Sequence, residues 1–205
     1  MRGTSSQDLT RCLSLARAGN EQALGRLLQQ YRTYLELLAH VQVGHRLQVR
    51  SDQSDIVQET FLRASRGFSQ FRGNSERELL AWLRQILSTT LAGALRKHCA
   101  TGRRDAHVEC NLAEMLDQSS AALDKALLSA RSTPSQQVSR REQVVIVANA
   151  MAALPEPYRQ VLVLRHVEGL SFPQVAQRMD RSPDAVRSLW ARALTCLRST
   201  LGDAQ

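Results

Sequence analysis

Apolar residues recur at steps of three and four positions from about Asn20 to His98, the spacing that places side chains on one face of a helix. The clearest repeat runs from about Ser51 to Phe68. Its packing side carries Ile56, Val57, Thr60, Phe61, Ala64 and Phe68. Its other side carries Asp52, Asp55 and Glu59. Ser51 is suited to cap the helix, and the two aspartates would lie in its first turn, where negative charge is favourable. The pattern predicts a helical domain in which this helix packs with one face and exposes the other.

A polar stretch interrupts this pattern once and ends it later. Residues 67–75, which include SQFRGNS, break the repeat, and residues 76–97 resume it, so a loop is expected between two helices. Past His98 the periodicity fades, and residues 101–139 are rich in Ser, Gln, Asp and small residues. This composition predicts a linker, with a short helix around residues 121–130 as an option within it.

Helical periodicity returns near Arg141 and continues to the end of the chain. Pro155 and Pro157 predict a helix start, because proline fits the first turn of a helix. The apolar run VLVL that follows ends at Gly169, which suits the left-handed residue that terminates a helix. A further helix is expected directly after this stop.

Residues 172–190, FPQVAQRMDRSPDAVRSLW, carry the pattern of a helix-turn-helix. Ser171 and Gln174 have the spacing of a capping box at the first helix, and Ser182 is suited to cap the second. Asp180 occupies the turn, where glycine is common, and aspartate tolerates left-handed geometry better than most residues. Apolar positions spaced for a steep crossing of the two helices are Val175, Ala176, Met179, Val186 and Leu189.

The last helix is expected to bury one stripe and to expose arginines on its other side. The predicted stripe is Val186, Leu189, Trp190, Ala193, Leu194, Leu197 and Leu201, and the exposed positions are Arg187, Ser188, Ala191, Arg192, Thr195 and Arg198. Arginine contacts phosphates and guanine edges in the major groove, so this side predicts a DNA-binding surface. The alternative is a charged face that only interacts with water.

Composition supports an all-helical protein with an anionic partner. Lys and Arg number 27 against 19 Asp and Glu, for a formal charge of +8, and aromatic residues make up only 4%. Such a charge favours nucleic acid, while the low aromatic content disfavours a single-strand binder that stacks many bases. No apolar run approaches a membrane span and the start MRGTSSQD lacks a signal-peptide core, so a cytoplasmic protein without membrane insertion is expected.

Cysteine spacing and the known catalytic motifs indicate neither a metal centre nor an active site. The four cysteines form no CxxC pair, and the cluster of His98, Cys99, His107 and Cys110 does not have the spacing of familiar zinc sites. There is no phosphate-binding glycine loop, HExxH or nucleophile elbow. We therefore expect no catalytic residues, no metal, no cofactor and no enzymatic activity.

Two segments in this order resemble the extracytoplasmic-function (ECF) group of sigma factors in the sigma-70 family. SDQSDIVQETFLRASRGFSQFRG is similar to the family's segment that binds the polymerase clamp and leads into the promoter-melting loop. LPEPYRQVLVLRHVEGLSFPQVAQRMDRSPDAVRSLWARALTCLR is similar to its promoter-reading C-terminal domain. The resemblance implies an all-α fold of two small helical domains joined by a flexible linker, with a helix-turn-helix in the second.

The resemblance also implies domain boundaries and partners. An N-terminal extension would span residues 1–19, a region 2-like domain residues 20–100, the linker residues 101–140 and a region 4-like domain residues 141–205. The implied partners are promoter DNA and core RNA polymerase, the latter through its β′ clamp and β flap. An anti-sigma factor is a further candidate partner.

Three groups of site residues follow from the resemblance. Polymerase binding would involve Asp52, Asp55, Gln58 and Glu59. The minus-10 element would meet Phe71, Arg72, Gly73, Asn74, Arg84, Ser88, Thr89 and Arg96. The minus-35 element would meet Arg181, Ser182, Asp184, Arg187, Ser188 and Arg192. Thr89 and Gly93 depart from the Asn and Asp often found in the minus-10-reading helix of the family.

The alternative from the residues alone is a two-domain helix-turn-helix regulator that binds an operator without being a polymerase subunit. Response regulators carry a similar C-terminal motif. A receiver domain, however, would need alternating strands and helices, and residues 20–98 show no strand pattern of that kind.

Overall fold

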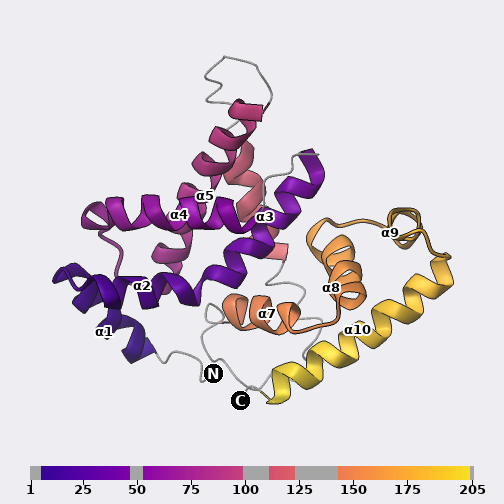
Figure 1. The fold of residues 1–205 in the computed structure, drawn as a ribbon. Helices are drawn as coiled ribbons and strands as arrows, with labels where there is room; N and C mark the ends of the chain where they lie inside the picture. The colour runs from indigo at the N-terminus through magenta and orange to yellow at the C-terminus, as the bar shows by residue number, and fades with distance from the viewer. Residues whose placement is uncertain (1–5, 47–52, 99–110, 123–142, 204–205) are drawn as a thin grey trace. The chain divides into compact units, whose positions relative to one another are not determined.

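The computed structural model describes residues 6–46, 53–98, 111–122 and 143–203, and within these residues it contains helices and turns but no strand (Figure 1). The expected all-α fold is therefore confirmed. The chain divides into two compact units, residues 4–118 and residues 119–205. No helix in the described part of the chain is long and apolar enough to cross a membrane.

The described part of the first unit begins with five helices. They are α1 (Ser6–Arg17), α2 (Glu21–Gln30), α3 (Arg32–Arg46), α4 (Gln53–Gly67) and α5 (Glu76–His98). A 3-10 turn, Phe68–Gln70, follows α4 directly. The start of α2 is fixed by Asn20, whose side-chain oxygen accepts a hydrogen bond from the backbone N–H of Ala23 at 2.9 Å.

The core of the first unit lies where α4 packs against α3 and α5. Large side chains that are completely buried in this core come from four of the helices and include Leu27, Tyr34, Leu35, Leu38, Val57, Leu79, Leu83 and Leu87. Each fully buried Leu contributes roughly 1.5–3 kcal/mol relative to an exposed one. The helical segments expected on both sides of the polar loop are thus the elements that enclose this core.

Helix α1 lies in the segment expected only as an N-terminal extension. It packs against α2 and buries Leu9, Leu13 and Ala16. A helix of this length is marginal alone in water, so its stability comes from this packing more than from its own sequence. The three apolar positions do have helical spacing, but polar and charged residues separate them.

A helix also lies within the range expected as a linker. Residues 111–122 are helical. Leu112 and Leu116 of this helix are buried, with exposed fractions of 1% and 0%. Asp117 of this helix accepts a hydrogen bond from Arg84 of α5 at 2.6 Å. The optional helix around residues 121–130 falls almost entirely outside the described residues.

The second unit contains α7 (Gln143–Ala152), α8 (Glu156–Leu162), α9 (Phe172–Met179) and the long α10 (Pro183–Asp203) (Figure 1). A π-helical turn, Val163–Val167, extends α8 and ends near Gly169, which has the expected left-handed backbone with φ +70°. The capping box at α9 is also present, with the N–H of Ser171 donating to Gln174 Oε1 at 2.8 Å. These local signals position the α9–α10 pair.

Candidate nucleic-acid interface

Helices α9 and α10 form a helix-turn-helix around a left-handed Asp180. Its backbone has φ 52° and ψ 52°, and the N–H of Arg181 closes the turn on the carbonyl of Ala176 at 3.0 Å. Val175 and Val186 are completely buried between the two helices. Because aspartate adopts this conformation more readily than most residues, the turn forms without glycine, as predicted.

All six residues predicted to meet the minus-35 element lie exposed in the turn before α10 or along its first three turns. They are Arg181, Ser182, Asp184, Arg187, Ser188 and Arg192. Ser182 caps the helix, since its Oγ accepts from the N–H of Ala185 at 3.2 Å. The structure therefore gathers one exposed, arginine-rich helix start that has the size of a major-groove reading helix.

Arg187 is the most constrained of these arginines. Its guanidinium pairs with Asp184 at 2.5 Å and lies 5.8 Å from the centre of the Phe172 ring. Arg165 lies over the same ring at 5.0 Å. The ion pair and the ring contact together hold the Arg187 guanidinium beside Asp184 and Phe172 in this structure.

Trp190 packs against Phe172 and His166, next to the Arg187 site. Its Nε1–H donates to His166 Nε2 at 2.9 Å, and its ring meets Phe172 edge-on with 5.5 Å between centroids. Burial, together with the charge of Arg165, lowers the pKa of His166, which favours the neutral ring that can accept this bond. Trp190 is only half-buried, yet these contacts agree with the packing role expected for it.

In the first unit, the loop after α4 rests on an aromatic cluster. The ring of Phe71 lies 5.0 Å from that of Trp82 and 5.8 Å from that of Phe68. Phe71 is 6% exposed, so its ring belongs to the core and is not placed to stack on a base. The neighbouring Arg72 and Asn74 are exposed.

Glu78 holds this loop through three hydrogen bonds. Its Oε2 accepts hydrogen bonds from the N–H groups of Asn74 at 2.9 Å and Ser75 at 3.0 Å, and from Ser75 Oγ at 2.7 Å. The bonds from Ser75 and Asn74 lower the pKa of Glu78, which is therefore ionised at neutral pH. A Cβ on Gly73 would lie within 2.6 Å of Glu78 Cβ, so this close approach requires glycine.

Arg17 of α1 also binds the loop, and the sequence did not predict this contact. Its Nη1 donates to Asn74 Oδ1 at 2.9 Å, its Nη2 donates to the carbonyl of Gly73, and its guanidinium lies 6.0 Å from the centre of the Phe71 ring. The contact joins positions 57 residues apart. The sequence around Arg17 contains no pattern that would predict this contact.

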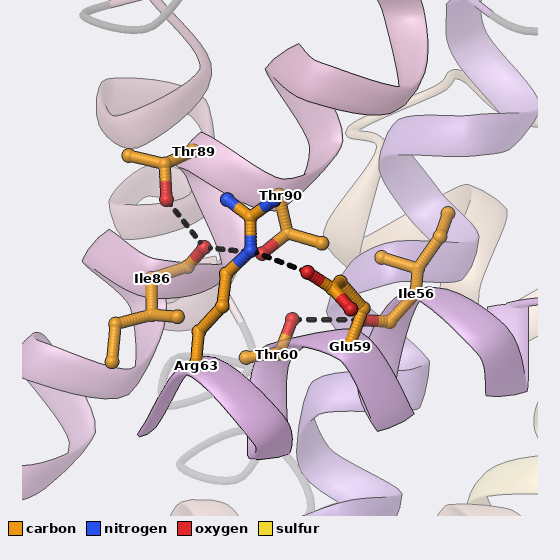
Figure 2. A network of polar contacts seen from close by, with 7 residues as sticks. All are labelled: Ile56, Glu59, Thr60, Arg63, Ile86, Thr89 and Thr90. Atoms are coloured by element: carbon orange, nitrogen blue, oxygen red, sulfur yellow. Dashed lines mark hydrogen bonds and ion pairs between the residues drawn. The ribbon is translucent and has the colours of Figure 1, made fainter. Parts of the chain in front are cut away.

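The remaining predicted minus-10 residues lie on α5 and are mostly engaged within the protein. Arg84 pairs with Asp117 and also donates to the Tyr34 hydroxyl at 3.2 Å. Ser88 is completely buried and donates to the carbonyl of Gln85 at 2.8 Å. Thr89 donates to the carbonyl of Ile86, and Figure 2 shows Thr90 sharing that acceptor. Arg96 is half-buried.

Of the residues predicted to bind polymerase, Asp55, Gln58 and Glu59 lie on α4. Asp55 and Gln58 are exposed, and Glu59 pairs with Arg63 at 2.8 Å on the same helix (Figure 2). Asp52 falls outside the described residues. Leu62 is 48% exposed and lies seven residues, or two helical turns, after Asp55. It adds an apolar group to this face that the sequence did not predict there.

No group of three or more metal-binding side chains occurs among the residues that the structure describes. Cys12 and Cys196 are free thiols. The cluster of His98, Cys99, His107 and Cys110 considered for zinc falls on side chains outside the described ones.

The fold and the arginine-bearing helix define a helix-turn-helix protein with a second, all-helical unit. Residues 30–100 match the family model of Sigma-70 region 2, and residues 145–197 match that of Sigma-70 region 4. The chain therefore belongs to the sigma-70 family, in its group of ECF RNA polymerase sigma factors, as the relatives below show.

The chain is similar along most of its length to curated ECF RNA polymerase sigma-E factors. That of Salmonella typhimurium is 32% identical over 142 residues, 69% of this chain and 70% of the relative. That of Haemophilus influenzae is 31% identical over 177 residues, 85% of each. Among solved structures, CnrH in complex with the cytosolic domain of CnrY is 23% identical over 96% of this chain and 98% of that one, with a TM-score of 0.37.

Proposed function

We propose that this sigma factor binds core RNA polymerase through the outer face of α4, reads the minus-35 element with α10, and meets the opening minus-10 element with the loop at residues 71–74 and with α5. The observation that carries the proposal is the helix-turn-helix whose six predicted DNA-facing residues are all exposed. The domain roles follow the expected boundaries, with residues 20–100 for polymerase and minus-10 binding and residues 141–205 for minus-35 binding.

At the minus-35 element, α10 enters the major groove with its N-terminal end leading. Arg187 then reaches a guanine edge, where its two donors match the O6 and N7 acceptors, while Arg181 and Arg192 neutralise phosphates. The positive end of the helix dipole at the start of α10 attracts a phosphate of the DNA backbone. Asp184 orients Arg187 in the free protein through their ion pair.

At the minus-10 element, Arg72 and Asn74 are the exposed groups of a loop that is already shaped before DNA arrives. Extruding a base costs a few kcal/mol, which hydrogen bonds from a pre-organised loop help to offset. Phe71 contributes by supporting the loop from below. Arg84, Ser88, Thr89 and Arg96 are proposed as secondary contributors on α5, where their present bonds would have to yield before they reached DNA.

At the polymerase, the acidic face of α4 meets a basic surface on the β′ clamp. Asp55, Glu59 and Asp52 supply the charge, Gln58 supplies hydrogen bonds, and Leu62 supplies an apolar contact at the same face. Complementary charge of this kind speeds association and fixes the register of the partners. Residues 141–205 would meet the β flap.

We further propose that the protein acts by binding alone, in the cytoplasm where polymerase and chromosome meet. Promoter melting then draws on the free energy of contacts with melted DNA, and no catalytic residue, metal or cofactor takes part. An anti-sigma factor remains a candidate regulator.

Run-off transcription with purified core polymerase on a genomic promoter pool tests the proposal. The expected result is a small set of transcripts that appear only when this chain is added, from promoters that share two sequence elements. Transcription equal to that of core polymerase alone, in a reaction where a sigma factor of known activity works, would overturn it. A pull-down with core polymerase separates a loss of polymerase binding from a loss of promoter reading.

A further inference from the structure

The contact between Arg17 and the loop at residues 71–74 has no part in the proposed function so far. Arg17 ends α1, and its side chain engages three groups of the loop: the carbonyl of Gly73, the side-chain oxygen of Asn74 and the ring of Phe71. The same loop is also held by Glu78. The loop is thus held by two side chains of opposite charge.

The chemistry of this contact determines which way the Asn74 amide faces. A guanidinium carries only donors, so the group of Asn74 that meets Arg17 must be the oxygen, Oδ1. The amide nitrogen with its two donors is then the end left for another partner. Among the described residues, no acceptor is bonded to that nitrogen, and Asn74 is exposed.

We propose that Arg17 is a positioning residue for promoter recognition: it holds Asn74 with its amide N–H groups presented to an acceptor on an unpaired minus-10 base. This inference rests on the proposed role of the loop in meeting the minus-10 element. Without Arg17 the amide is free to rotate by half a turn and to present either a donor or an acceptor, so its discrimination between bases declines.

The rigid geometry of the guanidinium makes it suitable for this task. Its fork bonds two adjacent loop residues at once, which restrains the backbone at Gly73 together with the Asn74 side chain. Gly73 cannot take up a side chain without meeting Phe71 and Glu78, so the loop has little room to adopt a different path. The N-terminal helix α1 thereby becomes part of the minus-10-reading apparatus.

The test is run-off transcription from a promoter library randomised through the minus-10 element, with saturating core polymerase and the full chain. Arg17→Ala should reduce the preference at one minus-10 position roughly two- to tenfold, the range of one net hydrogen bond. The preference at the minus-35 element and the affinity for core polymerase should stay as in the wild type. Arg17→Lys, which keeps a donor but not the fork that bonds Gly73 and Asn74 together, should restore only part of the preference.

Arg11→Ala is the matched control, since Arg11 is an exposed arginine of the same helix and the structure gives it no hydrogen bond or ion pair with the loop. Asn74→Ala should lose the same preference as Arg17→Ala, and the double variant should lose no more than Asn74→Ala alone, because Arg17 acts through Asn74. Circular dichroism of each variant reports whether α1 still folds. If Arg17→Ala unfolds, Arg17→Gln carries the test, because it keeps the aliphatic stem of the side chain and removes the charged fork.

The outcomes separate the two proposals. If Asn74→Ala changes the minus-10 preference and Arg17→Ala behaves like Arg11→Ala, the positioning role of Arg17 is wrong while the role of the loop stands. If neither Asn74→Ala nor Arg72→Ala changes the minus-10 preference, the proposed role of the loop itself is wrong. Losses that add up in the double variant would also refute positioning through Asn74.

Discussion

Asp184 and Arg187 lie three residues apart on α10 and form an ion pair whose arginine also rests near the Phe172 ring. Both partners are exposed, so the pair adds little to the stability of the fold. Its effect is on the direction of the Arg187 side chain at the surface proposed to read DNA.

Arg187→Ala should weaken promoter binding by about 1–3 kcal/mol and relax the preference at one minus-35 position, the signature of a base-reading arginine. Footprinting of the holoenzyme on promoters mutated at each minus-35 position measures both effects. Arg26→Ala on α2, which removes an exposed arginine from the first unit, should leave both unchanged. A uniform loss at all promoter sequences would instead assign Arg187 to a phosphate.

Asp55→Arg combined with Glu59→Arg should abolish association with core polymerase, because charge reversal at a complementary interface costs several kcal/mol. Helicity should remain, since both side chains are at the surface of α4 and the pair of Glu59 with Arg63 is weak. A core pull-down with circular dichroism of the same samples measures the two. Glu21→Arg, an exposed reversal on α2, is the control, and normal core binding by the folded double variant would reject this face.

Gly73→Ala should destabilise the first unit by roughly 1–3 kcal/mol, the usual cost of forcing an extra methyl group into a packed site. The new Cβ would meet the ring of Phe71 and the Cβ of Glu78, neither of which is the far end of a flexible chain. Gly25→Ala on α2 meets nothing within 4 Å and should stabilise by about 0.5–1 kcal/mol. Urea unfolding in a Trp190→Phe background, followed by Trp82 fluorescence, compares them, and equal midpoints would contradict the prediction.

The stability of the second unit should decline as the pH falls through 6.5. Because the pKa of His166 is lowered in the folded state, the unfolded chain takes up a proton there that the folded chain does not, and protonation removes the acceptor of Trp190. Above pH 6.5 both states are neutral and this contribution is complete. Urea unfolding in a Trp82→Phe background, followed by Trp190 fluorescence, measures the slope. His166→Gln should flatten it, and an unchanged slope would assign the pH dependence to other groups.

What the sequence could predict was set by local chemistry. The turn at Asp180, the capping box at Ser171 and the left-handed Gly169 each depend on a few neighbouring residues, and the structure contains all three. The polar loop and α5 follow from a clear periodicity. Helix caps and apolar repeats were therefore enough to predict the all-α fold and the exposed residues of α10.

Contacts between distant segments could not be predicted in this way. Arg84 meets Asp117 across 33 residues, so a residue expected at DNA is engaged by a helix expected as linker. Arg17 meets Asn74 across 57 residues. Phe71 was expected at the minus-10 element, yet its burial depends on Trp82 in the next helix. Tertiary packing decides each of these, and a repeat of apolar positions does not encode it.

The carboxylate of Glu78 belongs to the first turn of α5 while its bonds hold the backbone of the preceding loop. The loop and the helix start therefore behave as one mechanical piece, and a shift of either is passed to the other. Under the role proposed for this loop, a single loop substitution can weaken the minus-10 preference. Redirecting that preference to another sequence would require matched substitutions in the loop and in the first turn of the helix that supports it.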